Sequence, residues 1–305
     1  MINVTLETGT KRRKTVAEAT GQAGEAFFDR CKLADTILIK VNLVHHENQL
    51  ASTHVDAVRG ALDAIRPKTK AKIIIGDAGY HGTKAAFRNF GYEELLSEYQ
   101  NIELKDLNDD EWVEGYSILT DGSKNTIRIS KTAKTADVKI CLTVMKMHRD
   151  VGVSLSVKNW TVGTWVAPSR VSATGLIWAR WPWLHEQGPW AHHQTITELY
   201  RQLPCDLAIV DGIMAMEGDG PTSGTPVPLG VVLAGTDALA VDAVGCTLMG
   251  VDPHDVGYLQ LASDAGLGVI DMGKIDVPPA TMTQLARHFA RPAGFDEKIL
   301  AWRRS

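Results

Sequence analysis

Two lysines, a histidine and an asparagine gather over 146–159, at the end of one stretch of the chain, and are well suited to acid–base chemistry. The stretch runs over 139–159 and reads KICLTVMKMHRDVGVSLSVKN. Its opening apolar run, over 138–144, is rich in β-branched residues and predicts a buried strand that stops at Lys146. Because α/β proteins bind ligands at the ends of their strands, we expect a site formed by Lys146, His148, Lys158 and Asn159. The alternative is a connection with solvated charges, but the flanking segments are too apolar for an ordinary surface loop.

Each residue of this group suits a particular step. His148 is a candidate general acid–base, because histidine titrates nearest neutrality. Lys146 and Lys158 are candidates for binding an anionic substrate, a carboxylate or a phosphate, and for taking part in catalysis. Asn159 would orient the substrate by hydrogen bonds.

Carboxylates form a second cluster. A buried strand over 206–210 runs into the sequence DGIMAMEGDGP, which contains Asp211, Glu217 and Asp219. These side chains could hold a divalent metal, act as bases or pair with the lysines, and Asp211 is a catalytic candidate. The alternative is a tight loop whose acids cap backbone N–H groups. Because parallel strands end at one edge of a sheet, we predict one pocket lined by Lys40, Lys146, His148, Lys158 and Asp211.

Earlier strands add further candidates. The strand predicted over 36–43 contains Lys40 and Asn42, which would bind and orient an anion. Asp77 follows the strand predicted over 71–75 and opens a glycine-rich loop over 76–83. It could orient a lysine, bind a metal or simply cap the next helix. The loop matches neither the P-loop nor the dinucleotide fingerprint, so no nicotinamide cofactor is expected.

The order of elements predicts the fold class. Strand 36–43, helix 53–65, strand 71–75 and helix 84–89 form the pattern of a parallel βαβ unit. Further strands are expected over 206–210 and 229–234, a hairpin at Asp121-Gly122, and helices over 15–30, 195–202, 238–249 and 282–291. We therefore predict one α/β unit over 1–305, with a mostly parallel sheet flanked by helices.

Six of the eight tryptophans lie between 160 and 190. The segment 160–193 has little helical or strand periodicity, so it could be a lid, an oligomer contact or a loop packed on itself. Exposed aromatic rings on a monomer would be costly. Our preferred interpretation divides the segment. Trp160 and His193 would contact substrate, and a homo-oligomer interface would contain Trp178, Trp181 and Trp183.

Composition limits the classes of partner and cofactor. A hydrophobic content of 44% and a net charge of −4 give no reason to expect nucleic acid or a membrane as partner. No apolar run approaches the length of a membrane helix, and 1–14 lack the apolar core of a secretion signal, so a cytoplasmic location is expected. No CxxC spacing occurs among Cys31, Cys141, Cys205 and Cys246, so no iron–sulfur cluster is expected.

Several segments, taken in order, resemble the domain-of-unknown-function family 362. They are 39–44 (IKVNLV), 76–77 (GD), 146–148 (KMH), 157–159 (VKN), 210–213 (VDGI), 217–221 (EGDGP), 235–237 (GTD) and 241–244 (VDAV). The resemblance covers about 36–250 and implies an α/β domain whose strand ends collect these polar residues. The family has no settled reaction. Many relatives carry a ferredoxin module with paired CxxC motifs, which this chain lacks, so the resemblance argues against electron transfer. The tryptophan-rich segment is longer than the family pattern and suggests a specialised substrate.

These residues favour a small-molecule enzyme that acts on an anionic, aromatic substrate. The set suits proton-transfer chemistry, namely isomerisation, decarboxylation, elimination or cyclisation, better than hydride transfer. The alternative is a ligand- or cofactor-binding protein without turnover, or a redox accessory protein.

Overall fold

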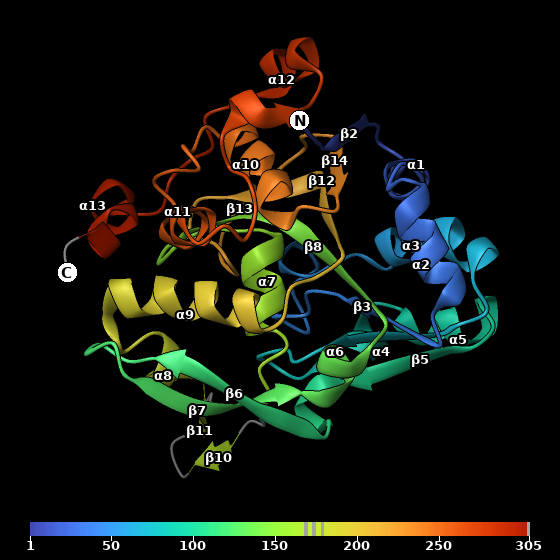
Figure 1. The fold of residues 1–305 in the computed structure, drawn as a ribbon, viewed down its shortest axis with the longest axis horizontal. Helices are drawn as coiled ribbons and strands as arrows, with labels where there is room; N and C mark the ends of the chain where they lie inside the picture. Colours follow the sequence, from blue (N-terminus) through green and yellow to red (C-terminus); the bar gives the residue numbers. More distant parts are fainter. Residues whose placement is uncertain (168–169, 173–174, 178–179, 304–305) are drawn as a thin grey trace.

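A mostly parallel sheet organises the protein, as the sequence predicted (Figure 1). The computed structural model describes residues 1–167, 170–172, 175–177 and 180–303. The strand order is β2-β14-β12-β8-β3-β4-β5, and β12, β8, β3, β4 and β5 run parallel. β14 is antiparallel to both of its neighbours. The bounds are β2 Thr5–Thr8, β14 Val231–Gly235, β12 Leu207–Glu217, β8 Val138–His148, β3 Thr36–Lys40, β4 Lys72–Asp77 and β5 Ile102–Asp106.

Helices cover both faces of this sheet, because successive strand residues point to opposite sides. Ile37 and Ile39 of β3 lie in a core with the helices α1 to α4, whereas Leu38 lies in the second core. The first group is α1 Arg12–Gly21, α2 Glu25–Leu33, α3 Val55–Ile65 and α4 Thr83–Asn89. The second group is α7 Ser156–Val162, α9 Gly188–Gln202, α10 Ala238–Leu248 and α11 Gly257–Asp264. Each face therefore has its own hydrophobic core.

Two central strands extend beyond their predicted ends. β8 continues to His148, whereas the sequence predicted that this strand stops at Lys146. The extension is paired: Lys146 lies opposite Ser154 and His148 opposite Gly152 of the short strand β9 (Gly152–Ser154). β12 likewise continues to Glu217 and pairs with β13 (Thr225–Val227). These short strands supply hydrogen-bond partners for backbone N–H and C=O groups of the two extensions, which would otherwise be unpaired.

The expected hairpin at Asp121-Gly122 is present, formed by β6 (Trp112–Ile118) and β7 (Lys124–Ser130). The single helix predicted over 15–30 is wrong. The segment forms two helices, α1 and α2, with a short turn between them. Gly24 in this turn has a φ of 91°, which other residues rarely adopt. Smaller elements are β1 Ile2–Asn3, α5 Leu95–Glu98, α6 Lys131–Thr135, β15 Ile275–Asp276, α12 Pro279–Leu285 and α13 Phe295–Ile299.

The tryptophan-rich segment contains more regular structure than its sequence indicated. Its first residues belong to α7, and a two-stranded hairpin (β10 Arg170–Ser172, β11 Gly175–Ile177) and α8 (Trp181–Leu184) come before α9. Trp160 and Trp165 are buried, whereas Trp181 and Trp183 are 37% and 42% exposed. Trp178 lies outside the described residues.

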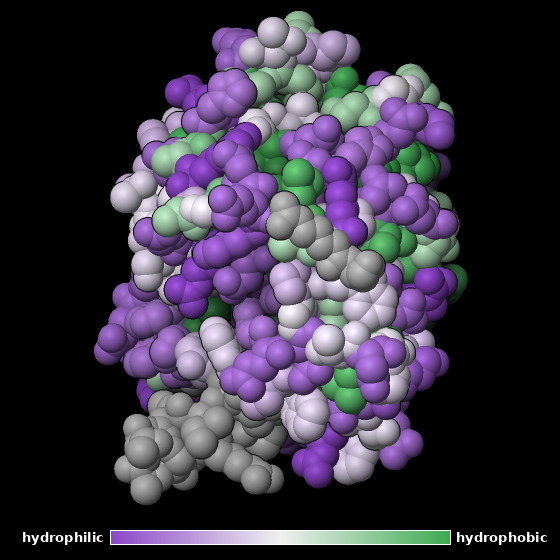
Figure 2. Space-filling view, turned by 90° about the vertical axis from the view of Figure 1, so that its left-hand side faces the viewer, coloured by the Kyte–Doolittle hydropathy of each residue, from purple (hydrophilic) through white to green (hydrophobic). Residues whose placement is uncertain are grey.

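The face in Figure 2 is mainly hydrophilic, and its hydrophobic residues form small separate groups. In the described part of the chain, no helix is both long and apolar enough to span a membrane.

Candidate functional site

A cavity of about 630 Å³ lies at the edge of the sheet where β3, β4 and β8 end. Seven of the residues singled out in the first cluster and the earlier strands line it together: Lys40, Asn42, Asp77, Lys146, His148, Lys158 and Asn159. The sheet thus brings together side chains that lie more than a hundred positions apart in the sequence.

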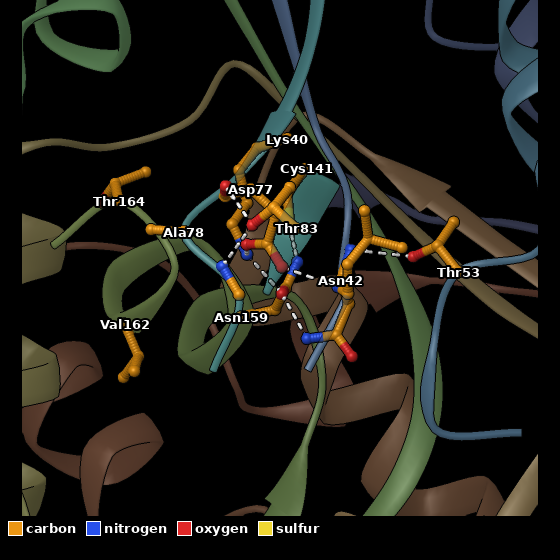
Figure 3. Close-up of polar contacts among 12 residues, drawn as sticks. Lys40, Asn42, Thr53, Asp77, Ala78, Thr83, Cys141, Asn159, Val162 and Thr164 are labelled. Carbon is orange, nitrogen blue, oxygen red and sulfur yellow. Dashed lines mark hydrogen bonds and ion pairs between the residues drawn. The ribbon is translucent and has the colours of Figure 1, made fainter. Parts of the chain in front are cut away.

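Lys40 is the centre of a buried polar network, shown in Figure 3. Its Nζ lies 2.8 Å from Asp77 Oδ1 and donates a hydrogen bond of 2.5 Å to Asn159 Oδ1. The same oxygen accepts from Asn42 Nδ2 at 2.8 Å. Burial lowers the pKa of Lys40, and Asp77 opposes that shift. A Cβ added at Gly163 would lie 2.0 Å from Lys40 Nζ, so only glycine fits there. Lys40 therefore holds the pocket wall together.

Lys146 titrates near neutrality. Its side chain is fully buried, and its Nζ donates to Asn42 Oδ1 at 2.6 Å and to the Ala51 carbonyl at 2.7 Å. Burial, reinforced by the charges of Lys158 and Lys40, lowers its pKa to about 7. At neutral pH this amine is close to half protonated, so it can hold or release a proton.

Lys158 is the lysine most available to a ligand. It lies on α7, where burial lowers its pKa to about 8, and the charge of Asp150 opposes that shift. Among the described residues its Nζ has no hydrogen-bond acceptor and no carboxylate within ion-pair distance. Because Lys158 lines the cavity and keeps some exposure there, an anion bound in the cavity could pair with its ammonium.

Asp242 fixes the helix that carries Lys158. Its carboxylate accepts from the backbone N–H groups of Ser156 and Val157 at 2.8 and 2.9 Å, and from Ser156 Oγ at 2.5 Å. These groups open α7, which would otherwise begin with unpaired donors. Burial raises the pKa of Asp242 to about 7.

His148 lines the pocket in surroundings that differ from those its sequence suggested. Its Nδ1 accepts the backbone N–H of Asp150 at 3.1 Å, which assigns the ring proton to Nε2. Burial lowers its pKa well below the usual value, and the charge of Lys158 adds to this effect. The sequence interpretation assumed an ordinary histidine pKa. In the pocket His148 is a neutral hydrogen-bond donor at neutral pH.

The acidic cluster divides. Asp219 lines the pocket, but Asp211 does not, and its predicted place beside the lysines is wrong. Asp211 shares a face of β12 with Ile209, which lies in the core under α1 to α4, and there it pairs with Arg12 of α1 at 2.7 Å. Glu217 accepts the backbone N–H of Ala290 at 2.8 Å. No group of three or more His, Cys, Asp or Glu side chains in the described part of the chain could hold a metal ion.

Trp160 and His193 lie away from the pocket, contrary to the prediction that they contact substrate. Trp160 is two positions after Lys158, which is about 200° around a helix, so it points to the opposite side of α7. There it is fully buried, and its Nε1 donates to the Leu203 carbonyl at 2.7 Å. His193 is buried too, and its Nδ1 accepts the N–H of Tyr258 at 2.9 Å.

The structure also adds residues to the site that the sequence patterns did not single out. Arg180 is buried in the pocket wall, and it donates to the carbonyls of Val162 and Ala78 at 2.5 and 2.7 Å. Burial lowers its pKa to about 10, so it stays a cation at neutral pH. The other additions are Tyr80, His81, Arg149, Asp150, Ser154 and His185, and Trp181, which the sequence assigned to an oligomer interface, lines the pocket too. Arg180, Trp181 and His185 come from the segment without periodicity, where no pattern indicated which residues face inward.

The pocket carries an excess of positive charge when its lysines are protonated. Five cationic side chains line it, against the three carboxylates Asp77, Asp150 and Asp219. Only Lys40 among the lysines is neutralised by a carboxylate in direct contact, within the described residues. The cavity therefore attracts anions.

Comparison with known proteins gives a family. The model of the domain of unknown function 362 matches residues 37–247. The chain belongs to this family. A thylakoid-associated protein of Synechocystis is 28% identical over 259 residues, which are 83% of this chain and 74% of that protein.

Among solved structures, the lactate racemase apoprotein from Thermoanaerobacterium thermosaccharolyticum superposes with a TM-score of 0.54 at 18% identity. The match covers 81% of this chain and 57% of the racemase chain. The likeness establishes a shared α/β fold, and this chain spans little more than half the length of that structure.

Proposed function

We propose that the protein is an enzyme that moves a proton within a small carboxylate- or phosphate-bearing substrate, most simply an isomerase. The observation that carries the proposal is Lys158. Its side chain lines a cavity of about 630 Å³, and among the described residues no carboxylate lies within ion-pair distance of its ammonium. An anionic substrate would supply that ion-pair partner.

Three other groups support this assignment. Arg180 and Lys146 line the cavity and would hold the anionic group of the substrate. His148, neutral with its proton on Nε2, would donate a hydrogen bond to the oxyanion that develops when a proton leaves carbon. Lys158, with a pKa of about 8, would carry the proton itself.

The fold comparison agrees with this class. Lactate racemase is by name an isomerase of a small hydroxy acid, and its apoprotein shares the fold of this chain. Lysines whose pKa is lowered toward neutrality in a pocket are typical of sites that move protons, which favours an enzyme over a protein that only binds a ligand or a redox accessory protein.

The test uses lactate, malate, mandelate and phosphoglycerate as probes. Ligands are found by the rise in melting temperature, and loss of carbon-bound protons is then followed by NMR in D₂O. The Lys158→Arg variant keeps the positive charge but cannot give up its proton. We expect it to bind the ligands about as tightly as the wild type and to exchange protons at least about 100-fold more slowly.

The exposed residue Lys32 provides the matched control. Lys32→Arg should leave both binding and exchange unchanged. Exchange that survives in Lys158→Arg would remove Lys158 as the proton carrier. Binding without exchange in the wild type would make the protein a ligand-binding protein instead.

A further inference from the structure

A second proton-carrying group lies in the same pocket and reaches it from another element. His185 follows α8, whereas Lys158 lies on α7. The Nδ1 of His185 is 3.4 Å from Asp150 Oδ2. Its ring stacks on Trp181 at 4.2 Å and meets the edge of His192 at 4.6 Å. The carboxylate and the two rings hold this imidazole in one orientation.

The surroundings of His185 keep it neutral. Burial is the largest effect and lowers its pKa, and the charges of Lys158 and Arg149 act in the same direction. Asp150 opposes them. The nearby His148 and His192 are neutral as well, because burial lowers the pKa of each. With Asp150 accepting the proton on Nδ1, the lone pair of His185 is on Nε2.

We propose that His185, oriented by Asp150, is the second base of a two-base isomerisation in which Lys158 is the other proton carrier. The inference rests on the proposed function and names its reaction more closely. His185 Nε2 takes the proton from the carbon beside the substrate carboxylate, and the electrons of the broken C–H bond move into the carboxylate. The Lys158 ammonium then gives its proton to that carbon, and a new C–H bond forms. The step leaves an imidazolium and a neutral amine, and exchange with water or reaction in the reverse direction restores both.

The pocket also indicates a class of substrate. A C–H bond beside a carboxylate is acidic enough for such bases only when a second group withdraws electrons, as an aromatic ring does. Trp181 lines the cavity next to His185, and an aromatic side chain in the wall of a pocket favours a planar substrate. We therefore infer a chiral 2-aryl carboxylate, for which mandelate is the probe.

The test follows each enantiomer of mandelate separately in D₂O, by NMR and chiral chromatography. The wild type should exchange the α-proton of both and interconvert them. His185→Asn should lose interconversion by at least about 100-fold, yet still exchange the enantiomer that Lys158 deprotonates. Lys158→Arg should show the reverse preference. Asp150→Asn should slow only the enantiomer assigned to His185.

His254, which is exposed, gives the matched control, and His254→Asn should behave like the wild type. His185→Gln and melting curves show whether loss of activity reflects loss of folding. Interconversion that persists in a folded His185→Asn, or equal loss of exchange from both enantiomers, overturns the inference and leaves the proposed function standing. Exchange of another acid but not of mandelate overturns the substrate class. Exchange of no probe by the wild type overturns the proposed function as well.

Discussion

At the scale of single residues, burial changes what each polar side chain can do. Lysine ordinarily stays protonated far above neutrality, but burial brings the pKa of Lys146 to about 7 and that of Lys158 to about 8. Histidine ordinarily titrates near neutrality, but burial takes the pKa of His148 well below that range. Burial thus moves the pKa values of the two lysines toward neutrality and that of the histidine away from it.

The lowered pKa of Lys146 makes the stability of the protein depend on pH. Its pKa is about 7 when folded and close to 10.4 in an unfolded chain. Between these values the unfolded state binds more protons, so the free energy of unfolding should rise with pH, by at most about 1.4 kcal/mol per pH unit for this one group. Lys146→Met should make the slope shallower in urea unfolding between about pH 7 and pH 10. Lys32→Met, at an exposed position, should not. An unchanged slope in Lys146→Met would show that Lys146 keeps an ordinary pKa in the folded protein.

The sequence could predict the residue types of the site better than their roles. Lys40, Lys146 and Lys158 were found because charged groups at strand ends of an α/β sheet meet at one edge. Their pKa values depend on how completely the surrounding helices exclude water, which no local pattern encodes. Asp211 was misplaced because its side of the strand is set by alternation and by a partner, Arg12, some 200 positions away.

At the scale of elements, α7 positions Lys158 and Asn159 in the pocket wall. The helix is short, and the backbone N–H groups of Ser156 and Val157 depend on the single carboxylate of Asp242, which comes from α10. One face of α7 presents Lys158 and Asn159 to the cavity, and the other places Trp160 in the core. Trp160 was assigned to the substrate because it directly follows Asn159 in the sequence. Consecutive residues of a helix point to different sides, so Trp160 does not share the orientation of its neighbour.

Removing the Asp242 carboxylate should loosen α7. Asp242→Ala leaves two buried backbone donors without an acceptor and Ser156 Oγ with only the Ala238 carbonyl, so we expect the free energy of unfolding to fall by about 2–5 kcal/mol in urea denaturation. Because Lys158 and Asn159 lie on this helix, anion binding should weaken too. Asp29→Ala, at an exposed position on α2, provides the control and should change neither quantity. A variant as stable as the wild type would mean that water replaces the carboxylate at the start of α7.

At the scale of the whole molecule, the fold could be predicted well. Its strands and amphipathic helices follow from simple periodic patterns in the sequence, and the order of these elements indicates a parallel sheet. The arrangement over 160–193 could not be predicted, because some of its tryptophans lie in the core and others lie on the surface. Trp160 and Trp165 lie in one hydrophobic cluster, whereas Trp181 and Trp183 are exposed on α8. Aromatic rings in the interior and on the surface give the same sequence signal but have opposite consequences for a variant.

The two kinds of tryptophan should respond differently to replacement by alanine. Trp160→Ala opens a cavity in the core and removes the hydrogen bond to Leu203, so it should cost about 3–5 kcal/mol of stability. Trp183 is 42% exposed and does not line the pocket, so we expect its indole ring to be covered by a second copy of the chain. Trp183→Ala should therefore leave the urea midpoint for unfolding of the monomer nearly unchanged. It should lower the molecular mass of the protein found by light scattering. The exposed Trp112, on β6, is the control, and its replacement should not alter the mass. If the wild type already has the mass of one chain at working concentration, the surface of α8 is not an oligomer contact, and Trp181 contributes to the pocket alone.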